Sequence, residues 1–183
     1  MIVIKNNCLC FFPLPVRGKR FVFIENAEKA IKLNPKYSII HYNLGLAYLE
    51  RGNHFSHSVH EKAFNYNIAI EKLKNMLEIF PEHIRAYEFL GICYVEFSKI
   101  NNKQENVSLA IQYLKEGFEK GADNLLLVDL YLNQDKLDDA LYILEILYER
   151  NKDVVHEFYK DGNLKPQYKV LENEVRFKKL LSK

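Results

Sequence analysis

The sequence predicts an all-α fold built from repeated helical hairpins, and three observations lead to this prediction. The motif N-L-G-L-A-Y at residues 43–48 returns as L-G-I-C-Y at residues 90–94, with the two tyrosines 46 residues apart. Pro35 and Pro81 are separated by the same interval. Glycine and proline are scarce, at 7 and 5 of 183 residues, which argues against a β-rich or disordered chain. Markers that recur in phase indicate a repeated structural unit.

Apolar residues three and four positions apart predict the helices in order. The first is expected over residues 21–33 and ends at Asn34-Pro35, because proline cannot continue the backbone hydrogen-bond ladder. Ser38 is expected to cap the second helix, which runs to about Arg51 before Gly52-Asn53. The third is expected from residue 67 to 80, or from as early as Ser56 or Ser58. Further helices are expected over residues 84–99, 107–120, 125–133, 137–150, 154–159 and 166–181.

This pattern divides the chain into three regions. Residues 1–20 are expected to form an irregular N-terminal arm, because Pro13, Pro15 and Gly18 interrupt any helix. We expect this arm to cover the first exposed helix face. Residues 21–150 hold about three helical repeats, with insertions at 52–66 and 100–106. Residues 151–183 form a C-terminal cap of helical turns, since a terminal repeat must hide one apolar face from water.

The markers resemble the tetratricopeptide repeat, a pair of antiparallel helices with a small residue facing a small residue where the helices cross. The first unit matches the family pattern at His41, Leu44, Gly45, Tyr48, Ala69, Leu73, Met76 and Pro81. The second matches it at Tyr87, Leu90, Gly91, Tyr94, Ala110, Leu114 and Gly117. The third keeps Tyr131, Ala140 and Leu144, and the stretch 117–127 is similar to the turn of Sel1-like repeats.

The resemblance implies a short right-handed superhelix with a concave groove, and it also exposes two departures. The tyrosine-to-alanine separation is 21 residues from Tyr48 to Ala69 and 16 from Tyr94 to Ala110, against nine in the family and in the third unit. Both units are therefore expected to carry an insertion between their helices. Residues 21–35 resemble a second helix without its first, which leaves open a missing upstream helix or a misplaced start.

Several functional classes find no support in the sequence. Bases and acids nearly balance at 26 and 24, with no basic block, so nucleic acid is not an expected partner. No run of apolar residues is long enough for membrane insertion. The three cysteines, Cys8, Cys10 and Cys93, lack framework spacing, so we expect reduced thiols in a cytoplasmic protein. Motifs of nucleophilic, phosphate-binding and zinc-dependent enzymes are missing, so we expect no catalytic residue and no cofactor.

The spacing of His54, His57 and His60 is the one arrangement that suggests a metal site. On a continuous helix these three side chains point in different directions around the axis, so they cannot all reach one ion. We therefore expect a solvated insertion rather than a metal centre. Cys93 is expected to be a small core residue, because it lies on the packing face of its helix.

The candidate site is the concave groove that the family resemblance implies, formed by first-helix positions that packing leaves free. We expect it to be apolar with an acidic margin and to bind a peptide or amphipathic segment of a partner protein. The alternative is a structural or self-assembly subunit, a homodimer for example, whose groove is filled by its own arm or by another copy. The expected groove residues are Tyr42, Asn43, Leu46, Leu49, Glu50, Arg85, Glu88, Phe89, Ile92, Val95, Glu96 and Asp129, with Ile39, Leu125 and Leu132 at related positions.

Overall fold

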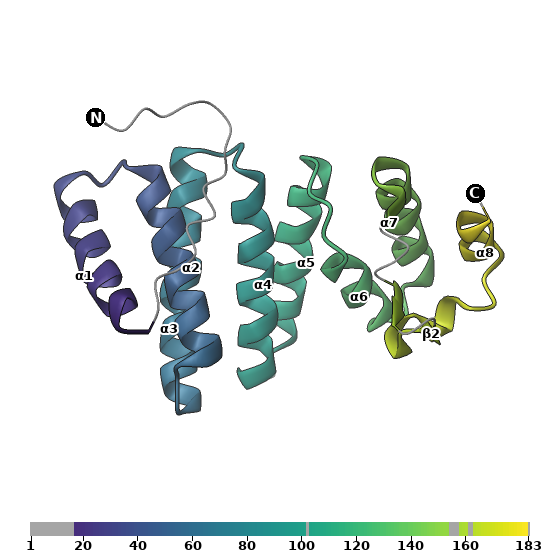
Figure 1. Ribbon diagram of the computed structural model, residues 1–183, viewed down its shortest axis with the longest axis horizontal. Helices are drawn as coiled ribbons and strands as arrows, with labels where there is room; N and C mark the ends of the chain where they lie inside the picture. Colours follow the sequence, from purple (N-terminus) through teal and green to yellow (C-terminus); the bar gives the residue numbers. More distant parts are fainter. Residues whose placement is uncertain (1–16, 102, 154–157, 161–162, 183) are drawn as a thin grey trace. The chain divides into compact units, whose positions relative to one another are not determined.

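The computed structural model describes residues 17–101, 103–153, 158–160 and 163–182. Helices dominate these residues, as predicted, and pack as consecutive pairs (Figure 1). The chain divides into two compact units, residues 1–80 and 81–183. Because the predicted arm lies largely outside the described residues, its irregular structure stays a prediction.

The first unit consists of three helices, α1 (Arg17–Leu33), α2 (Ser38–His54) and α3 (Val59–Ile79). Helix α2 packs along α3, with α1 against its other side (Figure 1). The repeat markers form the contact between α2 and α3: Leu44, Ala69 and Leu73 are completely buried. A methyl group added at Gly45 would lie 2.7 Å from Cγ of Leu73, so the close approach of the two helices requires glycine there.

Three boundaries in this unit differ from the predicted ones. Helix α1 begins at Arg17, so the last residues of the predicted arm are helical. Ser38 is the first helical residue rather than the cap, a position that Tyr37 holds without a side-chain bond. The predicted insertion at 52–66 is mostly helix, because α2 continues through Gly52 to His54 and α3 begins at Val59. The extra residues therefore lengthen both helices.

Polar contacts hold the lengthened end of the α2–α3 pair. Ser58 caps α3 by accepting a hydrogen bond from the Glu61 amide at 3.1 Å. The buried Asn65 amide donates to Ser56 Oγ, which in turn donates to the Arg51 carbonyl. Tyr66 packs its ring where a side chain on Gly52 would stand, and its hydroxyl donates to Asn53. These bonds pair most of the polar groups that a longer hairpin brings together at its tip, although Oδ1 of Asn65 is buried without a hydrogen-bond partner.

The second unit begins with the same arrangement in α4 (Ile84–Asn101) and α5 (Gln104–Glu119). Gly91 faces Leu114 so closely that a methyl group on Gly91 would overlap the leucine side chain. The predicted insertion at 100–106 is again absorbed by helix, since only residues 102 and 103 lie between α4 and α5. Asn106, predicted in a polar loop, is buried in α5 and donates to Asn101 Oδ1.

The third hairpin joins the short helix α6 (Leu126–Leu132) to α7 (Leu137–Arg150). Gly121 follows the end of α5 with a φ of 105°, a conformation that favours glycine. The Arg150 guanidinium donates to the carbonyls of Phe118 and Ala122 and lies 4.6 Å from the Phe118 ring. Arg150 thus ties the end of α7 to the end of α5.

The C-terminal cap contains β1 (Tyr159–Lys160), β2 (Asn163–Leu164), the 3₁₀ helix η2 (Pro166–Leu171) and α8 (Val175–Leu181). The predicted helix at 154–159 is wrong at Tyr159, which pairs with Leu164 in a two-residue ladder; residues 154–157 lie outside the described residues. Phe158, Tyr168 and Phe177 pack their rings together and are buried. The cap is therefore helical turns plus a small hairpin around an aromatic core.

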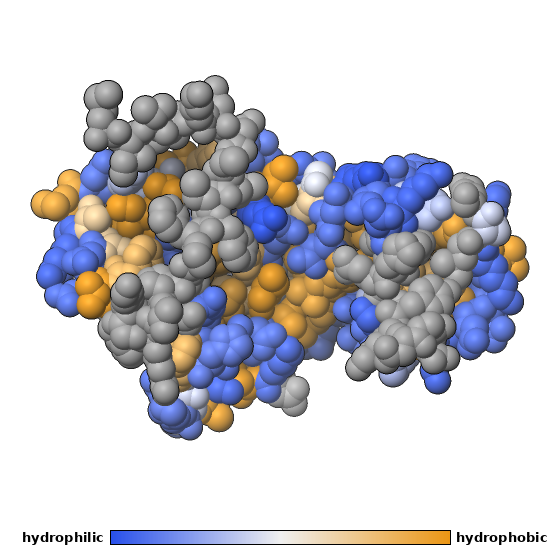
Figure 2. Space-filling view, in the orientation of Figure 1, coloured by the Kyte–Doolittle hydropathy of each residue, from blue (hydrophilic) through white to orange (hydrophobic). Residues whose placement is uncertain are grey.

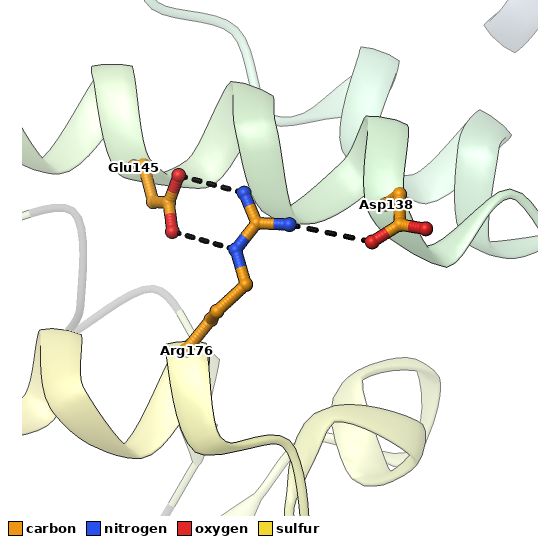
Figure 3. A network of polar contacts seen from close by, with 3 residues as sticks. All are labelled: Asp138, Glu145 and Arg176. Carbon is orange, nitrogen blue, oxygen red and sulfur yellow. Dashed lines mark hydrogen bonds and ion pairs between the residues drawn. The ribbon is translucent and has the colours of Figure 1, made fainter.

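An arginine fixes the last helix of the cap to the third hairpin. Arg176 on α8 donates through Nε and Nη2 to the two carboxylate oxygens of Glu145, at 2.9 and 2.8 Å. Its Nη1 reaches Asp138, two turns away on α7, at 3.3 Å (Figure 3). The paired bonds to Glu145 orient the guanidinium as well as attract it. Helix α8 is thus joined to α7 by this ionic contact, while Phe177 packs against Phe158 within the cap.

Candidate interaction surface

Helix α2 leaves one narrow face open in the first unit. Between His41 and Glu50, every residue is buried except Asn43, Leu46 and Glu50. Together with Ile39, which is 40% exposed, these residues stand four, three and four positions apart and so lie on one face of the helix. We call Ile39, Asn43, Leu46 and Glu50 the α2 stripe.

Helix α4 has the matching face in the second unit. Between Ala86 and Tyr94 only Glu88, Phe89 and Ile92 are not buried. Arg85, Phe89, Ile92 and Glu96 repeat the spacing of the α2 stripe at an interval of 46 residues, and we call them the α4 stripe. The α4 stripe has Phe89 and Ile92 in its middle, the α2 stripe has Asn43 and Leu46, and both end in a glutamate. In Figure 2 hydrophobic colour gathers over α4 and α5 of this unit, with hydrophilic residues beside it.

On the third hairpin the corresponding face is covered by the cap. Leu126, Asp129 and Leu132 are the half-buried residues of α6, and η2 packs against this helix. The Tyr168 hydroxyl bonds to Asp129, and Lys165 is close enough to act on its charge. Burial raises the pKa of Asp129, while Tyr168 and Lys165 oppose this rise. Asp129, predicted to line the groove, thus contributes to attachment of the cap.

The other predicted groove residues fall into two groups. Tyr42 and Leu49 are buried, at 7% and 5% exposure, and lie beside the α2 stripe rather than on it. Val95 is half-buried beside the α4 stripe. On α2 and α4, the predicted groove residues that remain at least partly accessible are Asn43, Leu46, Glu50, Arg85, Glu88, Phe89, Ile92, Val95 and Glu96.

The charged groups of the α4 face are arranged around its apolar centre. Burial raises the pKa of Glu88, and the neighbouring Arg85 and a hydrogen bond with Asn124 oppose the rise. Glu96 pairs with Lys99 at 2.6 Å, an exposed contact that contributes little to stability. A second cation could approach these carboxylates without displacing a buried group. This face of α4 therefore has an apolar centre with acidic groups at its edge, while the groove itself stays a prediction.

The cysteine and histidines that could suggest a reactive or metal-binding site do not form one in the described residues. Cys93 is completely buried in α4, and burial raises the pKa of its thiol well above the usual range, which disfavours the reactive thiolate. His54 ends α2, His57 lies in the connection and His60 lies in the first turn of α3. Within the described ranges no cluster of three His, Cys, Asp or Glu side chains could hold a metal ion. The same residues contain no helix long and apolar enough to cross a membrane.

Sequence patterns did not identify the arginines and the cap contacts that order the last third of the chain. Arg150 and Arg176 each act through partners 27 to 38 residues away, and such pairs leave no local periodicity. One local signal was present: Arg150 ends an amphipathic helix, where a cation is favoured by the helix dipole.

Comparisons with known proteins agree with this architecture. A family model described as tetratricopeptide repeat matches residues 26–56, which include about half of α1 and all of α2. No curated protein sequence matches the chain significantly.

Two solved structures resemble the chain in fold. A crystal structure of MamA matches with a TM-score of 0.65 at 18% identity, covering 91% of this chain and 86% of that chain. The MamA RS-1 ArsTM double mutant matches with a TM-score of 0.57 at 17% identity, covering 75% of this chain and 68% of that chain. The predicted helical-hairpin fold is thereby confirmed, while the Sel1-like turn stays a prediction.

Proposed function

We propose, from the premise that this chain is a tetratricopeptide-repeat protein, that it is a non-enzymatic scaffold that binds a segment of another protein. The observation that supports this most directly is the repetition of an open stripe on α2 and α4. Packing buries the other residues in the middle of each helix except Glu88, yet leaves the same four-position face accessible in both. A repeated face that packing does not use is the kind of surface on which repeat proteins bind their partners.

The chemistry of the two stripes indicates the kind of segment that would fit. In the first unit Leu46 offers apolar contact area near Glu50, and in the second unit Phe89 and Ile92 offer it near Glu88 and Glu96. On either stripe, an amphipathic or extended segment with apolar anchors and flanking Lys or Arg would bury the apolar side chains and complement the carboxylates. An acidic segment would be repelled by the same carboxylates.

The proposal is tested with stripe variants and matched controls. Leu46→Glu and Ile92→Glu place a charge within the stripes, whereas Asn67→Glu and Ser108→Glu place it at exposed positions on α3 and α5. We expect the stripe variants to lose partners in quantitative affinity purification, and to lose binding to synthetic amphipathic peptides rich in lysine, while the controls retain both. Identical partner lists and peptide affinities for all four variants would refute the proposal.

The second candidate is a structural subunit that assembles with copies of itself. The exposed side chains of Val22 and Leu33 on α1, at 56% and 89%, favour it, because such residues are often buried in assemblies. Light scattering across a range of protein concentrations separates the two candidates, since only self-assembly predicts a mass that rises with concentration. A cytoplasmic location is part of either proposal, supported by the free thiol of Cys93.

A further inference from the structure

The first turn of α4 is capped by a histidine. The Nδ1 atom of His83, the residue before the helix, accepts a hydrogen bond from the Ala86 backbone amide at 3.1 Å. The same amide also lies 3.0 Å from the His83 carbonyl, so the ring supplies one of two acceptors. Ala86 is completely buried, so water does not freely replace the ring. A side chain that accepts from an amide at this position stabilises the start of a helix.

The donor in this bond determines which protonation state the cap requires. A backbone N–H can only donate, so Nδ1 of His83 must be unprotonated, and the neutral ring carries its proton on Nε2. In an imidazolium both nitrogens carry a proton, and Nδ1 can no longer accept. By contrast, Nε2 of His41 bonds to the Pro35 carbonyl at 2.8 Å, and a carbonyl is an acceptor. Of these two ring contacts, the one made by His83 is incompatible with proton binding.

The surroundings of His83 also disfavour the charged ring. Burial lowers the pKa of His83 below its ordinary value of 6.5; a backbone hydrogen bond opposes this shift, and the positive charge of Arg85 adds to it. The positive end of the helix dipole acts in the same direction as Arg85. The capped turn is therefore complete above about pH 6.5 and is lost as the pH falls through the folded-state pKa of His83.

Two carboxylates near the start of α4 have partners of their own. Glu82 pairs with Lys120, the residue after α5, at 2.9 Å. Burial raises the pKa of Glu88, which interacts with Arg85, Asn124 and Asp123. Because Glu88 also titrates in the acid range, it is the group from which an effect of His83 must be separated.

The titrating cap distinguishes α4 from the two preceding helices. Tyr37, which stands 46 residues before His83, is the cap residue of α2 and makes no side-chain cap bond. Helix α3 is capped by Ser58, whose hydroxyl does not titrate. Sensitivity of a helix start to protons is thus expected at α4, where the first turn carries Arg85 of the α4 stripe.

We propose that His83 is a pH-sensitive cap, whose ring, once protonated, releases the Ala86 amide and loosens the first turn of α4. Acidification then loosens the end of the α4 stripe that carries Arg85, while the glycine contact at Gly91 keeps the rest of the helix in place. The switch lies within the helix and needs no partner; only its effect on binding rests on the proposed function.

Hydrogen exchange of the full chain, followed by NMR, measures this turn directly. The amides of Ala86 and Tyr87 are compared near pH 7.5 and near pH 5, each rate being divided by the rate of an unstructured peptide at the same pH. We expect protection to fall about fivefold at the lower pH, which is the usual effect of removing a helix cap. Because no partner is present, failure of the proposed binding function leaves this test intact.

Three variants separate His83 from other titrating groups. His83→Asn keeps a capping side chain that does not titrate, and we expect the high protection of neutral pH at both pH values. His83→Ala has no side-chain cap, and we expect low protection at both. Glu88→Gln removes the second titrating group of this region, and we expect it to keep the pH dependence of wild type. Circular dichroism checks that the variants retain their helical content.

Four results would overturn the proposal. Equal protection of wild type at both pH values would mean that proton binding does not release the cap. The same fall in His83→Asn would assign the pH dependence to another group, and its loss in Glu88→Gln would assign it to Glu88. NMR signals of the ring nitrogens that place the proton on Nδ1 of His83 at neutral pH would exclude the capping bond. A fall that requires His83, with the proton on Nε2 at neutral pH, supports the proposal.

Discussion

The hairpins α2–α3 and α4–α5 are held together differently from α6–α7. In the first two, long helices meet through Gly45 and Gly91, and leucines from the second helix fill the space beside the glycine. Helix α6 has seven residues and contains no glycine, and it packs on α7 through buried residues such as Leu127, Val128 and Leu144. Arg150 and Arg176 instead join α7 to the end of α5 and to α8. The two long hairpins thus require glycine for the close approach of their helices, whereas the third hairpin is attached to its neighbours by directional polar contacts.

The largest expected effect comes from filling the glycine contact. Gly91→Ala places a methyl group on the Leu114 side chain, and we expect it to lower the free energy of unfolding by about 2–3 kcal/mol, measured by chemical denaturation. Gly117→Ala is the control, because its added Cβ would meet Tyr87 Cβ only at 3.1 Å, and we expect a smaller loss. The double variant Gly91→Ala/Leu114→Ala should lose less than the two single effects combined. If Gly91→Ala were as stable as wild type, the α4–α5 hairpin would not require glycine at its helix contact.

A smaller loss is expected at the arginine that serves the third hairpin. Arg150→Met keeps the apolar stem but removes the donors to the carbonyls of Phe118 and Ala122, and the side chain is about one-third exposed. We expect a loss of about 1–2 kcal/mol in the free energy of unfolding, because partly buried carbonyls lose their partner. Arg150→Lys should fall between wild type and Arg150→Met, since a single ammonium cannot reproduce the fork. Equal stability of all three would show that packing alone holds α7.

The exposed ionic contact of Arg176 should act locally. With Arg176→Met we expect faster hydrogen exchange of the α8 amides and little change in the exchange of α4 and α5. Raising the salt concentration should bring the wild-type exchange in α8 towards that of the variant, because salt screens exposed charges. If neither the variant nor the salt changed exchange in α8, the stability of the cap would come from Phe177 and its aromatic neighbours alone.

The smallest effect is a pH dependence at Glu88, whose hydrogen bond with Asn124 links α4 to the segment before α6. Burial raises the pKa of Glu88 above its ordinary value of 4.5, so the folded state disfavours the charged carboxylate. Stability contributed by the protonated form is complete below pH 4.5 and is lost as pH rises through the folded pKa. We expect Glu88→Gln to be slightly more stable than wild type at pH 7 and equal to it below pH 4. An advantage that persists at low pH would contradict this cause.

Much of the fold follows from sequence because the repeat markers are packing residues. Leu44, Gly45 and Tyr48 and their counterparts sit where two helices touch, so their spacing reports the contact directly. The predicted insertions were misjudged for a related reason. Apolar periodicity reports which face of a helix is buried. Residues 59–66 have a weak apolar pattern, because polar contacts hold this end of the hairpin: Asn65 bonds to Ser56 and Tyr66 to Asn53.

The candidate surface was predictable in outline but less so by residue. The α2 and α4 stripes agree with the positions that packing was expected to leave free, whereas Tyr42 and Leu49 are buried beside the stripe. Sequence spacing locates a residue around the helix to within about one position. Because successive residues are 100° apart, an error of one position exchanges a buried side chain for an accessible one. The role of Asp129 in attaching the cap could not be predicted from sequence, because its partner Tyr168 lies 39 residues away in the cap.

The short connections inside each hairpin bear on how the chain folds. Helix α2 reaches α3 across four residues, and α4 reaches α5 across two, so the contacts next to each connection, such as Asn106 with Asn101, close small loops. Small loops lose little chain entropy on closing, and proteins rich in local contacts fold quickly. Each glycine-closed hairpin can therefore act as a separate folding nucleus, whereas the arginine clamps, with partners up to 38 residues distant, form after the hairpins they join.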